Sequence, residues 1–211
     1  MLVHVDEITK PSWALDFARV GRLNGKPVAM VANGPGPKLA GAAVDAVKAN
    51  QKMDALISIG FCGGLQTSLG ACDIFLATEV NGVAALAPSS SRTFKTGKLL
   101  SIDRVVSTAV EKATLAKNAD AVEMEAAAVA ARAKQYSIPF YAVRVVTDTC
   151  DEDFPVDFNQ MRSGDGRFSR AKIVAAALRR PGAVIPQLMK LNKRTKRAAQ
   201  ALGDFLADAR F

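Results

Sequence analysis

The chain has 211 residues, of which 49% are hydrophobic and 6% aromatic, and its formal net charge at pH 7 is +8. This length and apolar content suffice for the core of one domain, so we expect a single domain over residues 1–211. No run of about 20 apolar residues is present that could span a membrane. Asp6 and Glu7 stand where a signal peptide would be basic and then apolar. We therefore expect a cytoplasmic protein.

The placement of charge bears on binding partners. Lys and Arg exceed Asp and Glu, 28 to 20, but few aromatic residues and no recognition motif accompany the excess, so we expect no nucleic-acid partner. Much of the excess follows Arg167, which makes residues 169–211 a basic, helical C-terminal segment. Its charge has two interpretations: a solvated helix face, which is the commoner outcome, or a peripheral contact with anionic lipid headgroups.

Cysteine and histidine offer little for metal binding or nucleophilic catalysis. Cys62, Cys72 and Cys150 are odd in number and lack the spacing of metal ligands or of a disulfide framework. His4 is the single histidine, so a relay of serine or cysteine with histidine would have to recruit a residue close to the terminus. We expect no metal site.

Strands and helices alternate along most of the chain. Apolar runs predict strands at residues 28–32, 55–60, 73–80, 97–106 and 138–146. Helix formers predict helices at residues 39–49, 125–136, 169–180 and 186–208. The alternation predicts an α/β fold with three α/β/α layers around a twisted, mostly parallel mixed sheet. In such folds ligands bind beyond the carboxyl ends of the strands.

Two glycine-rich turns follow predicted strands, Gly34-Pro-Gly36 and Gly60-Phe-Cys-Gly-Gly64. Without a Cβ, the backbone N–H groups of such turns can approach an anion such as phosphate or the polar edge of a ribose. Neither turn matches a dinucleotide-binding or phosphate-loop pattern, and a tight turn with no ligand is at least as common.

Acidic residues stand at two further strand ends. Asp148 follows a buried strand directly, where a carboxyl group can serve as a proton donor or can cap a turn. Glu123 and Glu125 precede a helix, a position that the helix dipole favours without any function. Arg144 interrupts an apolar strand, and we expect it to pair with a carboxylate such as Glu123.

Taken in order, these segments resemble the superfamily of nucleoside phosphorylases and nucleosidases, which includes methylthioadenosine/adenosylhomocysteine nucleosidase. The most specific pieces are Val122-Glu-Met-Glu-Ala-Ala-Ala-Val129 and Val143-Arg-Val-Val-Thr-Asp148, which are similar to the V-E-M-E and R-x-x-S/T-D signatures. Ser101-Ile-Asp-Arg-Val-Val106 and Leu178-Arg-Arg-Pro-Gly182 are most similar to the hopanoid-associated phosphorylases, which act on adenosylhopane. The other matching segments are Arg22-Leu-Asn-Gly25, Asn33-Gly-Pro-Gly36, Ile59-Gly-Phe-Cys-Gly-Gly-Leu65 and Gly70-Ala-Cys-Asp-Ile74.

The resemblance implies a role for each matching residue. Asp148 would protonate the purine at N7 while the ribose gains oxocarbenium character, and Glu125 would bind the ribose hydroxyls. Met124 would pack under the sugar. Val122, Val105 and Val106 would line the base pocket, and Gly34, Gly36 and Gly63 would face the nucleophile, phosphate or water. Glu123, Phe61 and Cys62 are also implied to bind substrate. No organic cofactor is implied, and phosphate is a candidate co-substrate.

Two departures from the family pattern concern the nucleophile. Family members begin with a strand that in nucleosidases carries the carboxylate that activates water, and we expect this chain to lack a counterpart of it. Ser58 and Phe61 stand where bacterial purine phosphorylases have residues that bind phosphate.

The resulting hypothesis is cleavage of the N-glycosidic bond of an adenine nucleoside by phosphorolysis, on a substrate of the adenosylhopane type. The alternatives are a hydrolytic methylthioadenosine/adenosylhomocysteine-type nucleosidase and a nucleoside-binding protein without turnover. The resemblance also implies a homo-oligomer, at least a dimer.

Overall fold

The computed structural model describes residues 4–154, 156–179 and 181–211. Its first three strands, β1 (Asp6–Thr9), β2 (Phe17–Leu23) and β3 (Lys26–Ala32), form a small antiparallel sheet of their own. β2 and β3 meet at the turn Asn24-Gly25, where both residues have positive φ, as a tight hairpin turn requires. The strand expected at residues 28–32 is therefore present as β3, and the hairpin at Arg22–Gly25 pairs it with β2 outside the central sheet.

The central sheet contains six strands in the order β6-β5-β7-β8-β4-β9. Their bounds are β4 (Leu56–Gly64), β5 (Ile74–Val80), β6 (Val83–Ala84), β7 (Lys95–Ser101), β8 (Ala121–Glu123) and β9 (Phe140–Asp148). Residues 74–76 of β5 also pair with β9, so the sheet closes into a barrel. The α/β class is confirmed, but the sheet is not the middle of three layers. The sheet is mixed, as expected: β4–β9, β5–β7 and β7–β8 pair parallel, and the shorter pairings β4–β8, β5–β6 and β5–β9 are antiparallel.

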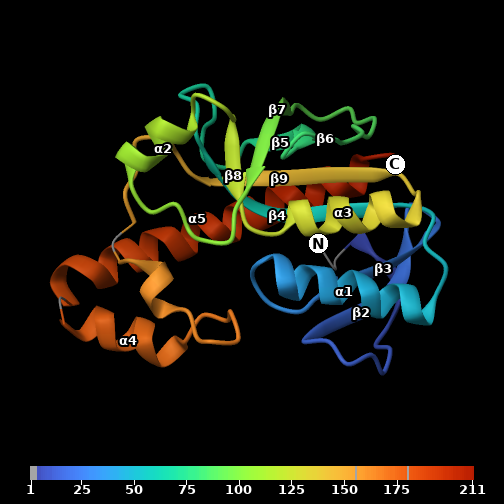
Figure 1. Ribbon diagram of the computed structural model, residues 1–211, viewed down its shortest axis with the longest axis horizontal. Coiled ribbons are helices and arrows are strands. Elements are labelled where there is room, and N and C mark those ends of the chain that lie inside the picture. Colours follow the sequence, from blue (N-terminus) through green and yellow to red (C-terminus); the bar gives the residue numbers. More distant parts are fainter. Residues whose placement is uncertain (1–3, 155, 180) are drawn as a thin grey trace.

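Helices cover the barrel on two sides (Figure 1). α1 (Pro37–Asn50) and α3 (Ala126–Tyr136) lie side by side, and their apolar faces pack with alternate strand residues such as Phe75 and Val146. The strand residues of opposite parity, such as Leu76 and Val145, pack against the C-terminal half of α5 (Pro181–Asp208). Alternate side chains of β5 and β9 therefore point to opposite faces of the sheet and belong to two different hydrophobic clusters.

The C-terminal helices differ slightly from their expected bounds. α4 spans Arg170–Arg179, and the expected end at Arg180 lies outside the described residues. α5 begins at Pro181, five residues before the expected start. Proline suits the first turn of a helix, and Pro186 removes one backbone hydrogen bond close to that end. None of the helices in the described part of the chain is long and apolar enough to cross a membrane.

Candidate active site

Three of the expected site residues meet where β4, β8 and β9 end. Gly63 pairs with Asp148 across the parallel strands and with Val122 across the antiparallel ones. A Cβ at Gly63 would lie 2.9 Å from Oδ2 of Asp148 and 3.5 Å from Cγ1 of Val122. The glycine therefore allows the buried Asp148 carboxyl group to lie against the backbone of β4.

Asp148 is paired with a lysine from a different part of the fold. Lys112, on α2 (Ala109–Leu115), is fully buried, and its Nζ lies 2.7 Å from Oδ2 of Asp148. The same ammonium group donates hydrogen bonds to the carbonyls of Thr149 (2.7 Å) and Glu152 (3.0 Å). The Thr147 hydroxyl donates to Oδ1 of Asp148 over 2.8 Å. All three polar contacts of the Lys112 ammonium group are therefore with the end of β9 or with the turn after it.

Sequence reasoning missed Lys112, although the chain contains a signal for it. On a helix, residues at i, i+3 and i+4 share one face. Leu115 and Ala116, three and four positions after Lys112, pack against a buried apolar cluster. A lysine on the apolar face of a short helix must find a buried partner, because burial of an unpaired ammonium is costly.

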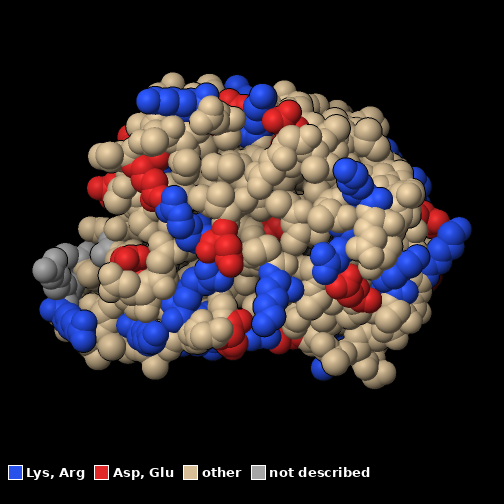
Figure 2. Space-filling view, in the orientation of Figure 1, with Lys and Arg blue, Asp and Glu red and all other residues tan. Residues whose placement is uncertain are grey.

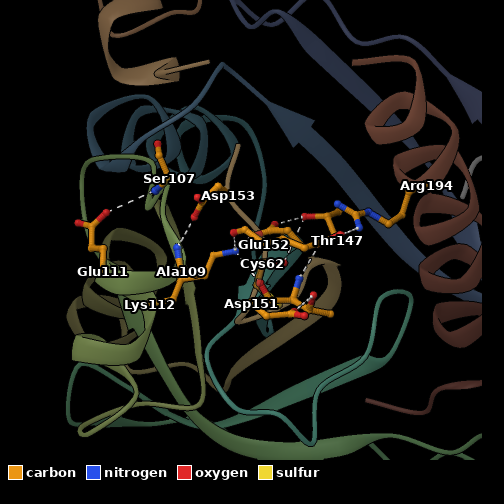
Figure 3. A network of polar contacts seen from close by, with 12 residues as sticks. Cys62, Ser107, Ala109, Glu111, Lys112, Thr147, Asp151, Glu152, Asp153 and Arg194 are labelled. Atoms are coloured by element: carbon orange, nitrogen blue, oxygen red, sulfur yellow. Dashed lines mark hydrogen bonds and ion pairs between the residues drawn. The ribbon is translucent and has the colours of Figure 1, made fainter. Parts of the chain in front are cut away.

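Glu152 and Arg194 extend this network towards α5. Figure 3 shows Lys112 and Arg194 approaching the segment after β9 from opposite sides. Arg194 donates to both carboxylate oxygens of Glu152 at 2.7 Å, and Glu152 accepts from the Thr149 amide at 3.0 Å. A cavity of about 340 Å³ beside Asp148 is lined by Glu152, Asp153, Phe154, Gln187, Lys190, Leu191 and Arg194.

The ribose-binding candidate Glu125 lies at the glycine loop. Its Oε1 accepts a hydrogen bond from the Gly36 amide over 2.7 Å, and Gly36, with φ 89°, precedes the first turn of α1. Burial and the nearby charge of Glu123 raise the pKa of Glu125 above its ordinary value of 4.5. Met124 is half-buried between these two acids.

Glu123 has a different environment from Glu125. Its carboxylate accepts from Arg144 at 2.7 Å and from the amides of Glu125 and Ala126 at 2.9 Å. Burial opposes ionisation, but the Arg144 guanidinium lowers the pKa of Glu123. Arg144 also donates to the hydroxyl and carbonyl of Ser58. The expected pairing of Arg144 with Glu123 is present, and it occupies the Glu123 carboxylate in holding β8, β9 and the start of α3 together.

A cleft of about 570 Å³ opens at the glycine loop. The segment after β9, which includes the short helix η2 (Phe158–Met161), lies over this loop. A Cβ at Gly36 would lie 2.9 Å from Oδ1 of Asp103 and 3.1 Å from NH2 of Arg162, and one at Gly34 would lie 3.2 Å from NH1 of Arg167. Arg162 is in turn paired with Asp103 at 2.8 Å. The cleft lining includes Gly36, Lys38, Asp103, Arg104, Asn159 and Arg162.

The other expected binding residues lie around these two centres. Val106 is buried in the same small cluster as Val122, and the backbone of the half-buried Val105 is held by the side chain of Asn159. Cys62 is in the core, where burial raises the pKa of its thiol, and its carbonyl accepts from Thr147. The side chain of Phe61 points to the face of β4 opposite to that of Cys62 and is exposed.

The protein is thus an α/β barrel with a buried carboxyl group at one strand end and a glutamate that is hydrogen-bonded to a glycine loop. The sequence profile of the phosphorylase superfamily matches residues 9–93 and 81–179. The chain belongs to this superfamily.

Within the superfamily, the chain is similar to several nucleosidases. A 5′-methylthioadenosine/S-adenosylhomocysteine nucleosidase of Shewanella pealeana is 26% identical, over 81% of this chain and 91% of the relative. Among solved structures, the Neisseria meningitidis nucleosidase in complex with methylthio-immucillin-A has a TM-score of 0.70 at 20% identity, over 98% of this chain and 90% of the other. The Colwellia psychrerythraea nucleosidase in complex with adenine has a TM-score of 0.59 at 22% identity, over 70% and 76%.

Proposed function

We propose that this chain hydrolyses the N-glycosidic bond of an adenine nucleoside. Hydrolysis was the alternative to phosphorolysis in the hypothesis drawn from the sequence. The similarity to proteins named as nucleosidases favours hydrolysis. The observation that carries the proposal is the buried carboxyl group of Asp148 at the end of β9, which Lys112 and Thr147 hold in one orientation beside a cavity. A carboxyl group positioned in this way is suited to proton transfer to a bound base.

In the proposed reaction Asp148 protonates the purine at N7 as the bond between C1′ and N9 breaks. The electron pair of that bond stays with the base, which leaves as neutral adenine. Lys112 keeps the carboxyl group oriented and supports its negative charge after the proton has left. Thr147 holds the other carboxyl oxygen, so the group has little rotational freedom.

Glu125 is proposed to accept hydrogen bonds from the ribose hydroxyl groups. Its carboxylate lies beside Gly36, two residues along the chain from Glu123. The hydrogen bond from the Gly36 amide fixes one oxygen and leaves further acceptor positions for the sugar. A carboxylate bound to the sugar hydroxyls supports the positive charge that develops on the ribose.

Water at the glycine loop is the proposed nucleophile. Glu125 and Asp103 both approach Gly36, and either carboxylate can accept a proton from water attacking C1′.

Phosphorolysis remains the second candidate because cations line the cleft beside Gly36. Lys38, Arg104 and Arg162 all face it, and such residues can bind phosphate. It ranks second because Arg162 is already paired with Asp103 and Arg104 with Glu111. The 5′ group of the nucleoside, including the adenosylhopane type, and a homodimeric state remain predictions.

The test is adenine release from adenosine, 5′-methylthioadenosine and S-adenosylhomocysteine, each with and without phosphate. Hydrolysis gives adenine and a free sugar without phosphate, whereas a sugar 1-phosphate formed only with phosphate supports the second candidate. Asp148→Asn should lower kcat by about 10²–10⁴. The matched control is Asp151→Asn, on an exposed aspartate in the turn that follows β9. Adenine binding without release by the unaltered chain would instead identify a binding protein.

A further inference from the structure

The helices α4 and α5 expose large apolar side chains on their outer faces. The exposed fractions are 57% for Val174 and 68% for Leu178 on α4, and 40% for Ile185 and 67% for Met189 on α5. The members of each pair are four residues apart, so each pair forms a stripe along its helix. In Figure 1, α4 and the start of α5 extend beyond the barrel, away from α1 and α3.

Basic residues lie near both apolar pairs along the same helices. Arg170 lies four positions before Val174, and Lys193 and Arg197 lie four and eight positions after Met189. All three are exposed. We call these seven residues the outer face of α4 and α5: Arg170, Val174, Leu178, Ile185, Met189, Lys193 and Arg197.

The charged residues of the segment that carries this outer face all have one sign. Residues 166–203 contain ten of the 28 Lys and Arg residues and none of the 20 Asp and Glu residues. Acidic residues outnumber basic ones, 20 to 18, in the rest of the chain. Figure 2 shows Lys and Arg side chains along the lower left of the molecule, where Figure 1 places α4. The basic character of the protein is therefore a property of this segment.

We propose that the outer face of α4 and α5 docks on an anionic lipid bilayer. Exposed apolar side chains can enter the boundary between headgroups and acyl chains, while the lysines and arginines bind anionic headgroups. The sequence is compatible with two interpretations of this basic segment, a solvated helix face and a contact with lipid headgroups. The four exposed apolar side chains favour the lipid contact, because a solvated face has no need of them.

Two other partners fit this surface less well. A symmetric dimer through the outer face would bring the same basic patch of two subunits together, with no acidic residue in the segment to offset the repulsion. A nucleic acid would match the charge, but the single aromatic residue of 166–203, Phe168, packs edge-on against Phe158 and no other aromatic side chain of the segment is available for a base to stack on.

The docking face is linked to the catalytic centre through α5. Gln187, Lys190, Leu191 and Arg194 line the cavity beside Asp148, and Met189 lies between them in sequence on the outer side. Docking would place this cavity close to the bilayer. The proposal does not depend on the reaction, and its test measures binding alone.

The experiment is co-sedimentation of the full chain with phosphatidylcholine vesicles, prepared with and without phosphatidylglycerol. One variant replaces Val174, Leu178, Ile185 and Met189 with serine, and a second combines Lys193→Glu with Arg197→Glu. The matched controls are Val110→Ser with Leu86→Ser, which are exposed elsewhere, and Lys95→Glu with Lys117→Glu, which give the same net charge. Thermal melting of each variant verifies folding.

We expect binding that requires phosphatidylglycerol, and a partition coefficient lowered by roughly tenfold or more in both outer-face variants and unchanged in both controls. Absence of binding by the unaltered chain would overturn the proposal, as would equal binding by the outer-face variants. A serine variant that elutes as a smaller species while still binding vesicles would assign the face to a second copy. Loss of binding in the charge variant alone, with tight binding of the unaltered chain to RNA, would assign it to a nucleic acid.

Discussion

The ammonium group of Lys112 lies 2.7 Å from a carboxylate oxygen of Asp148, and both side chains are buried. The two residues are brought together by α2 and by the end of β9, which are separate elements of the fold. Removing one partner of such a pair leaves a buried charge without compensation, which costs more than the pair itself contributes.

Lys112→Met should therefore destabilise the protein by about 3–5 kcal/mol in urea unfolding and should also lower kcat. The double variant Lys112→Met with Asp148→Asn should recover much of the stability, because no unpaired charge remains buried. It should recover no activity. A double variant as unstable as the single one would show that the lysine acts through packing and not through the pair.

Gly63→Ala should impair catalysis while preserving the fold. The new methyl group would lie 2.9 Å from Oδ2 of Asp148 and would displace the carboxyl group. A shift of about 1 Å in a catalytic group can cost roughly 10²-fold in kcat. Gly60→Ala on the same strand is the control, since nothing lies within 4 Å of its Cβ position. Equal effects of the two substitutions would indicate a general disturbance of β4.

The pH dependence of activity should report Glu125. Its carboxylate must be ionised to accept hydrogen bonds from the ribose, and burial raises its pKa above 4.5. The acidic limb of the kcat/KM profile should therefore lie above the pH of an ordinary glutamate, and Glu125→Gln should remove that limb together with most of the activity. A variant that keeps the limb would exclude Glu125 as its origin.

Ionisation of Glu125 is expected to support activity but to lower the stability of the folded protein. A folded-state pKa that is raised means that the folded protein binds this proton more tightly, so stability falls as pH rises from the unfolded-state pKa to the folded-state pKa. Glu125→Gln should consequently raise the melting temperature at neutral pH, because the amide keeps an acceptor for the Gly36 amide without the buried charge. A lower melting temperature would contradict this prediction.

Breaking the pair of Glu123 and Arg144 should be costly in stability. Glu123→Gln leaves the buried guanidinium unpaired, which should lower the free energy of unfolding by about 3–5 kcal/mol. Lys52→Ala is the comparison, since its ion pair with Asp54 is exposed and should contribute less than about 1 kcal/mol. Similar losses in both variants would show that burial adds nothing here.

Local pattern was enough to predict several elements. The helices near residues 39–49 and 125–136 and the strands near residues 55–60 and 138–146 correspond to α1, α3, β4 and β9. Apolar periodicity, glycines and prolines act over a few neighbouring residues, so they can be read from the sequence. The partner of Arg144 was also predictable, because a charge within an apolar strand needs a buried counter-charge.

The closure of the barrel, the position of β3 and the burial of Lys112 were decided by the tertiary structure. Whether β5 pairs with β7 alone or also with β9 depends on sheet curvature, which no local window encodes. Arg162 and Asp103 meet at Gly36 although they are 59 positions apart in the sequence. The residue types in the sequence indicate which side chains can carry the chemistry. Long-range packing selects which of them meet, because contacts between distant segments exist only once the whole chain has folded.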